Sequence, residues 1–121
     1  MEKQKSNLQA NIKKATIEML LLKLLSEEDM YGYQLSQELK KRSNGNYTIL
    51  EGSMYPILYR LADQNYISFF EKKVGKRQSR VYYHLEIAGL KYLEDMKQSY
   101  SDYLNTISFL LNSQKGDVYE T

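Results

Sequence analysis

Residues 51–61, "EGSMYPILYRL", carry side chains that suit contact with a polyanion. The Ser53 hydroxyl and the first N–H groups of a helix starting there suit a phosphate oxygen. The Tyr55 and Tyr59 hydroxyls can donate to phosphate, and Arg60 can reach phosphate or guanine. Together with Pro56, these residues predict a helix surface that contacts duplex DNA.

The alternative for this stretch is structural. Tyr55 and Tyr59 would then be partly buried, and Arg60 would pair with Asp63 three residues further along the helix. At about 100° per residue, the apolar residues fall on the opposite side, where a core would lie: Met54, Ile57, Leu58 and Leu61. Ser53 is expected as the N-cap, with Pro56 in the first turn.

A basic segment follows this helix. Residues 72–80, "KKVGKRQSR", hold five cations and no acid, although the net charge of the chain is only +2. Alternating β-branched and aromatic residues on both sides predict a β-hairpin with a basic tip. Lys73, Lys76 and Arg77 could neutralise phosphates of a duplex. The alternative is a charged, solvated loop.

Composition argues against catalysis. The 121 residues include no cysteine and one histidine, His84, which is expected to be an exposed strand residue. No zinc ligand set and no usual nucleophile–base pair can be built from them. We therefore expect no enzyme activity, no cofactor and no metal. No apolar run approaches the roughly 20 residues of a membrane span, so we expect no membrane association. The absence of cysteine fits a reducing cytoplasm, which is the expected location.

The elements that position these residues follow from apolar spacing. Residues 1–8 are expected to form a flexible arm, followed by two helices and the turn signal Asn44-Gly45. The helix of residues 51–61, the hairpin and a long last helix complete the order. This order predicts an α+β, mainly α fold: a winged helix-turn-helix domain over residues 9–86. Residues 87–112 add a long C-terminal dimerisation helix, and residues 113–121 a frayed tail.

The last helix is too long for this domain to bury alone, at roughly 38 Å. Its apolar stripe, with that of the first helix, favours a homodimer that would read two half-sites of a palindrome. Packing back on its own domain is the alternative. The residues expected in the dimer contact are Leu8, Ile12, Met19, Leu93, Met96, Tyr100, Leu104, Ile107 and Leu111.

Three segments resemble the PadR-like transcriptional regulators: "EMLLLKLLSEEDMYGYQL", "EGSMYPILYRL" and "SRVYYHLEIAGLKYL". The match is closest to the small, multidrug-regulator-like subgroup with a single C-terminal helix. The resemblance implies a dimeric winged-helix repressor whose third helix enters the major groove. It also implies that Tyr33, Ser53, Tyr55 and Pro56 lie at the DNA surface and that the wing tip holds Lys76 and Arg77. Gly32 would allow close packing at the start of the second helix.

The sequence departs from the family in two places. Glu86 replaces a common Thr, and no Trp is present in the last helix, where Tyr100 takes the corresponding place. A small aromatic or lipophilic effector could still bind at the dimer centre, at Met96, Tyr100 and Tyr103. The main functional hypothesis is thus a repressor that such an effector releases from DNA. The alternative is a winged-helix protein-interaction module without DNA binding.

Overall fold

The computed structural model describes residues 2–120, with side chains from Asn7 to Glu120. Met1, in the expected arm, and Thr121, in the expected tail, lie outside the described residues. The element order is α1 (Glu2–Leu25), β1 (Met30–Tyr31), α2 (Gly32–Arg42), α3 (Glu51–Asp63), β2 (Ile67–Lys73), β3 (Ser79–Leu85) and α4 (Ile87–Asn112). This order confirms the predicted winged helix-turn-helix with an added C-terminal helix.

Helices α1, α2 and α3 enclose one apolar core. Each presents an apolar stripe at helical spacing, and burial of these stripes removes apolar surface from water. The fully buried residues at its centre are Leu21, Leu22, Leu35, Met54, Leu58 and Leu61. The inner face predicted for α3 is therefore the face that anchors it, with Ile57 half-buried at the margin.

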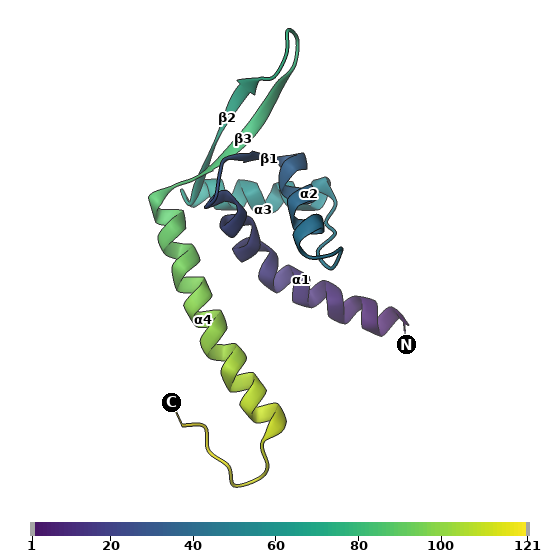
Figure 1. Cartoon of the computed structure of the whole chain (residues 1–121), viewed down its shortest axis with the longest axis vertical. Coiled ribbons are helices and arrows are strands. Elements are labelled where there is room, and N and C mark those ends of the chain that lie inside the picture. Colours follow the sequence, from purple (N-terminus) through teal and green to yellow (C-terminus); the bar gives the residue numbers. More distant parts are fainter. Residues whose placement is uncertain (1, 121) are drawn as a thin grey trace.

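The sheet forms the wing. β2 and β3 pair antiparallel from Ile67↔Leu85 to Lys73↔Ser79, and β1 pairs with β3 on its other side. In Figure 1 the β2–β3 hairpin projects from the helical body, while α4 runs away from the body in another direction. The wing tip and the far end of α4 are therefore well separated.

Three local features differ from the sequence-based expectations. First, α1 begins at Glu2, inside the expected arm. Residues 2–8, "EKQKSNL", contain no glycine, proline or β-branched residue, and Lys, Gln and Glu favour helix. Second, the short strand β1 was not expected. Third, α3 begins at Glu51 with Leu50 as N-cap, so Ser53 is not the N-cap and Pro56 lies inside the helix.

The segment after α4 turns back toward the helix (Figure 1). The ring of Tyr119 contacts that of Phe109, with centroids 5.3 Å apart. When the helix is counted at about 100° of rotation per residue, Phe109 falls on the side of α4 opposite Leu93 and Leu104. The tail thus covers an apolar ring outside the main apolar stripe.

Candidate nucleic-acid interface

The outer side of α3 is open to solvent. Ser53, Pro56, Tyr59 and Arg60 are exposed, and the Tyr59 side chain is 59% exposed. The buried residues of the same helix fix its rotation, so these side chains cannot turn inward without breaking the core. The structure therefore brings four of the predicted contact residues to the surface of one helix.

Tyr55 differs from its neighbours because it is half-buried. Its hydroxyl donates a hydrogen bond to Oε2 of Glu51 at 3.0 Å, and its ring stacks on Tyr59 with centroids 6.3 Å apart. Burial, followed by the Glu51 carboxylate, raises the pKa of the Tyr55 hydroxyl. The hydroxyl thus already has an acceptor within α3, and the ring edge is the part that remains for another contact.

Gly32 explains how the Tyr55 ring can lie where it does. A Cβ atom added at Gly32 would lie 2.9 Å from the Tyr55 hydroxyl oxygen and 3.1 Å from Cε1. Any larger residue here would push the Tyr55 ring aside, so glycine lets α2 begin this close to the ring in its present position. Gly32 and Tyr55 therefore set the spacing between α2 and α3.

A hollow of about 620 Å³ separates the start of α2, the outer side of α3 and the base of the wing. It brings together Tyr33, Tyr55 and Tyr59, which are distant in sequence. Its other lining residues include Phe69, Glu71, Arg80, Val81 and Tyr83. Burial raises the pKa of the Tyr83 hydroxyl to about 12. The hollow is therefore mostly aromatic, with one cation and two carboxylates at its edge.

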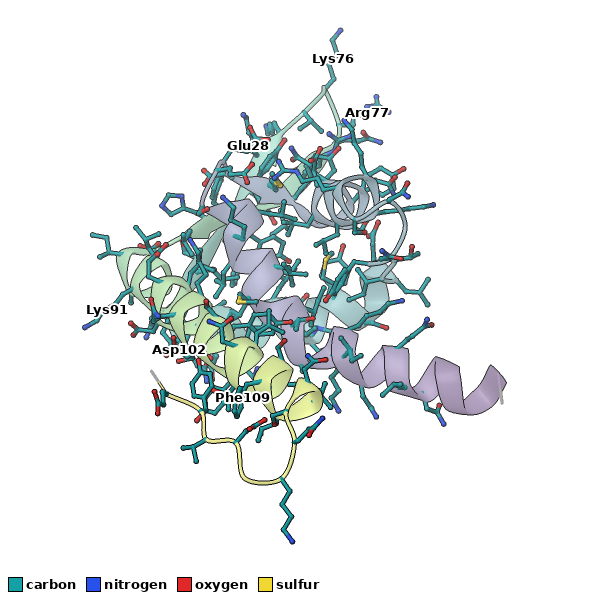
Figure 2. The ribbon with its side chains drawn as sticks, turned by 60° about the horizontal axis from the view of Figure 1, so that its bottom comes forward. Glu28, Lys76, Arg77, Lys91, Asp102 and Phe109 are labelled. Carbon is teal, nitrogen blue, oxygen red and sulfur yellow. The ribbon has the colours of Figure 1, made fainter. Side chains whose placement is uncertain are left out.

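The wing tip carries the predicted cations. Val74 N donates to Gln78 O at 3.0 Å and closes the hairpin, so Lys76 and Arg77 project at its end (Figure 2). Lys73 is exposed at the last pair of the strands. These three cations lie on a narrow ribbon, the shape that can follow a phosphate backbone or enter a minor groove.

Two further wing cations lie on aromatic rings. The Arg80 guanidinium carbon is 4.3 Å from the ring centroid of Tyr31, and Lys72 Nζ is 5.4 Å from that of Tyr82. Such contacts stabilise the cation by the ring quadrupole. Lys72 and Arg80 therefore stabilise the wing through their contacts with its rings. Lys73, Lys76 and Arg77 are exposed near its tip.

Arg60 does not pair with Asp63, although the structural alternative for residues 51–61 predicted that pair. Its Nη2 donates to Oε2 of Glu18 on α1 at 3.0 Å. The partner lies 42 residues away in sequence, so helical spacing within α3 could not reveal it. Likewise, His84 is exposed as expected, but its Nδ1 lies 2.7 Å from Asp29 Oδ1.

The residues expected in a dimer contact lie on two helices. Leu8, Ile12, Leu104, Ile107 and Leu111 are exposed. Met19 and Met96 are half-buried against the core, whereas Tyr100 and Tyr103, expected near an effector with Met96, are exposed. The structure differs from expectation at Leu93, which is only 1% exposed because it completes the core of its own chain.

Two other types of site, a metal centre and a membrane span, are not found among the described residues. Within residues 2–120, no group of three or more His, Asp or Glu side chains is placed to hold a metal ion. None of the helices in the described part of the chain combines the length and hydropathy that a membrane span requires.

The sequence model of one family, described as the transcriptional regulator PadR-like family, matches residues 21–95. The chain belongs to the PadR-like family. This match runs from the last five residues of α1 through the wing into the first third of α4, so it covers both the exposed side of α3 and the basic tip. Membership makes the protein a DNA-binding transcriptional regulator, and it confirms that the chain is not an enzyme.

Individual relatives agree with this assignment. A PadR-like transcriptional regulator of Bacillus cereus is 35% identical, with a TM-score of 0.74 over 86% of this chain and 99% of that chain. The transcriptional regulator YqjI of Escherichia coli (strain K12) is 32% identical over 82 residues, 68% of this chain and 38% of YqjI. A PadR family regulator of Eggerthella lenta, 24% identical, shares the fold, with a TM-score of 0.84 over 93% of this chain and 96% of that chain.

Proposed function

We propose that the protein is a homodimeric repressor that binds a palindromic operator. The observation that carries this proposal is the exposed side of α3, with Tyr59 and Pro56 outward, beside a wing whose tip holds Lys76 and Arg77. A helix of this kind can enter the major groove while a basic ribbon follows the adjacent backbone. A dimer bound across a promoter would block access of the transcription machinery.

The dimer part of the proposal is supported by unpartnered apolar surface. Leu104, Ile107 and Leu111 fall on one side of α4 at spacings of three and four, and all are at least half exposed. Leu8 and Ile12 extend a second exposed stripe along α1. Contiguous apolar surface of this kind marks an interaction site. A second copy of the same chain would cover it by twofold symmetry. Residues 9–86 would then form the DNA-binding domain and residues 87–112 the dimerisation helix.

Binding to DNA is tested with a labelled fragment upstream of the gene itself. Fluorescence anisotropy at several salt concentrations should show affinity that falls linearly with the logarithm of salt. A scrambled fragment of equal length should bind more weakly by a factor of about 1,000 or more. Equal affinity for both fragments, or affinity that does not respond to salt, would contradict sequence-specific binding.

The dimer is tested with Ile107→Glu, which places a charge on the exposed apolar stripe. Sedimentation should detect dimers of the wild-type chain and monomers of this variant, because burying an unpaired carboxylate is costly. Asn105→Glu adds the same charge at an exposed polar position outside the stripe and should leave the dimer intact. Monomers for both variants, or for neither, would contradict a contact through this stripe.

A small aromatic or lipophilic effector would bind near Met96, Tyr100 and Tyr103 of α4. The support is aromatic surface: both tyrosines are exposed on a single chain and would approach their copies across a twofold axis. Titration with ethidium in the absence of DNA should quench tyrosine fluorescence. The quenching should weaken in Tyr100→Leu. An unchanged signal up to the solubility limit would contradict this site.

A further inference from the structure

Helix α3 carries few of the side chains that read purine bases by paired hydrogen bonds. Its sequence, "EGSMYPILYRLAD", contains no Asn, Gln or Lys. Its single arginine, Arg60, donates a hydrogen bond to Glu18 of α1 at 3.0 Å. Asn and Gln pair with adenine, and Arg and Lys pair with guanine, in the major groove. Polar reading of purines by α3 would therefore depend on an arginine that α1 already holds.

The outer side of α3 presents apolar groups instead. Pro56 and Tyr59 are both exposed and lie three residues apart, so they are neighbours on the helix surface. The ring of Tyr55 stacks on that of Tyr59 with centroids 6.3 Å apart, while its hydroxyl donates to Glu51. Because the buried side of the helix fixes its rotation, this apolar surface is formed before DNA binds.

The hollow beside the wing continues the same surface. Phe69 of β2 and Val81 of β3 line this hollow together with Tyr55 and Tyr59. Both wing residues are at least 40% exposed. Apolar surface that extends over several elements marks an interaction site. The groups that face outward between α3 and the wing therefore suit an apolar group of a ligand.

A phosphate does not match this surface. The carboxylates of Glu51 and Glu71 line the hollow and would repel a phosphate. Among the described residues that line it, Arg80 is the one cation, and its guanidinium carbon lies 4.3 Å from the ring centroid of Tyr31. The exposed cations of the wing tip suit the DNA backbone better. The apolar surface of α3 is thus left for contact with bases.

Thymine offers the matching group. Its C5-methyl is the apolar group that base pairs present in the major groove, whereas contacts to sugars carry no sequence information. We propose that α3 reads thymine methyl groups of the operator, with Pro56 and Tyr59 as the side chains that cover them. Tyr55 supports Tyr59 through the stacked pair of rings. The assignment rests on the proposed function, since only a protein that binds a specific operator can depend on particular thymines.

The test replaces thymine by uracil, which lacks the methyl group and keeps every hydrogen-bonding group. The fragment upstream of the gene is prepared with thymidine or with deoxyuridine throughout, and both forms are titrated by fluorescence anisotropy. The wild-type chain should bind the uracil form about tenfold more weakly, at about threefold for one covered methyl in each half-site. A scrambled fragment should bind equally well in either form.

Tyr59→Ala assigns the effect to the protein side chain. This variant should bind the thymine form more weakly, and its preference for thymine over uracil should fall from about tenfold to about threefold or less. Lys76→Gln with Arg77→Gln is the control: it should weaken both forms and keep the tenfold preference, because phosphates are the same in both. Each variant is titrated with both forms, so any loss of folded chain cancels in the ratio.

Uracil interference locates the methyl groups. In fragments with sparse uracil, the bound fraction should be depleted of uracil at positions related by twofold symmetry, and Tyr59→Ala should lose some of them. Equal wild-type affinity for both forms, or an unchanged preference in Tyr59→Ala, would overturn the proposal. If the operator were still preferred over scrambled DNA, the proposed function would stand. Equal affinity for operator and scrambled DNA would overturn both.

Discussion

Arg60 of α3 donates a hydrogen bond from Nη2 to Oε2 of Glu18 on α1, with 3.0 Å between the two atoms. The carboxylate is the more enclosed partner, with 19% of its side chain exposed against 56% for Arg60. Burial, followed by this same carboxylate, raises the pKa of Tyr92 on α4. Glu18 therefore lies where α1, α3 and α4 approach one another, and it partly neutralises a cation on the surface that we propose meets DNA.

Replacement of Glu18 by Gln should strengthen operator binding. The amide keeps a hydrogen-bond acceptor for Arg60 but removes a negative charge close to phosphates. We expect about a fivefold gain, equivalent to about 1 kcal/mol for a nearby surface charge. The free energy of unfolding should change by about 1 kcal/mol or less, because the pair is partly exposed. Anisotropy titrations and urea unfolding measure the two effects. Glu94→Gln on α4 is the control, and weaker DNA binding by Glu18→Gln would contradict this role.

Tyr55 should contribute to DNA binding through its ring rather than its hydroxyl. Tyr55→Phe keeps the ring over Gly32 and loses only the hydrogen bond to Glu51, so operator affinity should stay within about threefold. Tyr55→Ala removes the ring and should cost about tenfold or more, while sedimentation still detects the dimer. If Phe binds as weakly as Ala, the hydroxyl itself contacts DNA. Loss of the dimer in Tyr55→Ala would instead show that the ring supports the core.

Much of α3 was predictable from periodicity alone. Apolar residues recur at helical spacing, so the burial of Met54, Leu58 and Leu61 and the exposure of Tyr59 follow from counting. The basic hairpin was equally visible, because alternating residues and a cluster of cations are local signals. The resemblance to the family added Gly32, whose close contact with Tyr55 no local pattern contains.

Other features depend on contacts between distant parts of the chain. Strand β1 exists because Met30 and Tyr31 pair with Tyr83 and Tyr82, and two residues are too few to show an alternating pattern. The Arg60–Glu18 pair joins two helices whose packing angle the sequence does not specify.

The wing tip should supply electrostatic affinity without sequence preference. Lys76→Gln with Arg77→Gln removes two cations that project at the end of the hairpin (Figure 2). If both contact phosphates, the slope of log affinity against log salt should fall by about 1.8, at about 0.9 per phosphate. Operator and scrambled DNA should weaken by similar factors. Lys91→Gln with Lys115→Gln removes equal charge from α4 and the tail and should leave the slope nearly unchanged. An unaltered slope in the wing variant would place its cations away from DNA.

We expect Gly89 to be required for stability. Because glycine has no side chain, the first turn of α4 can pack directly against the backbone of Tyr66, the residue before β2. A Cβ atom at Gly89 would lie 2.0 Å from the backbone oxygen of Tyr66 and 2.7 Å from Cδ1 of Leu85. The Tyr66 oxygen also accepts a hydrogen bond from Glu86 N at 3.0 Å, so it cannot move away freely. Gly89→Ala should therefore lower the free energy of unfolding by about 3 kcal/mol, typical of a forced backbone shift. That loss exceeds the gain of about 1 kcal/mol that alanine brings to a helix.

Gly52→Ala is the matched control for Gly89→Ala. It also lies in a helix, but nothing lies within 4 Å of an added Cβ. This variant should be neutral or more stable by up to about 1 kcal/mol, because alanine loses less backbone entropy than glycine on folding. Urea unfolding must be compared at one protein concentration, since a dimer gains apparent stability with concentration. Equal stability of the two variants would mean that α4 can shift along β2 at little cost. The contact between Gly89 and Tyr66 would then not fix where α4 begins.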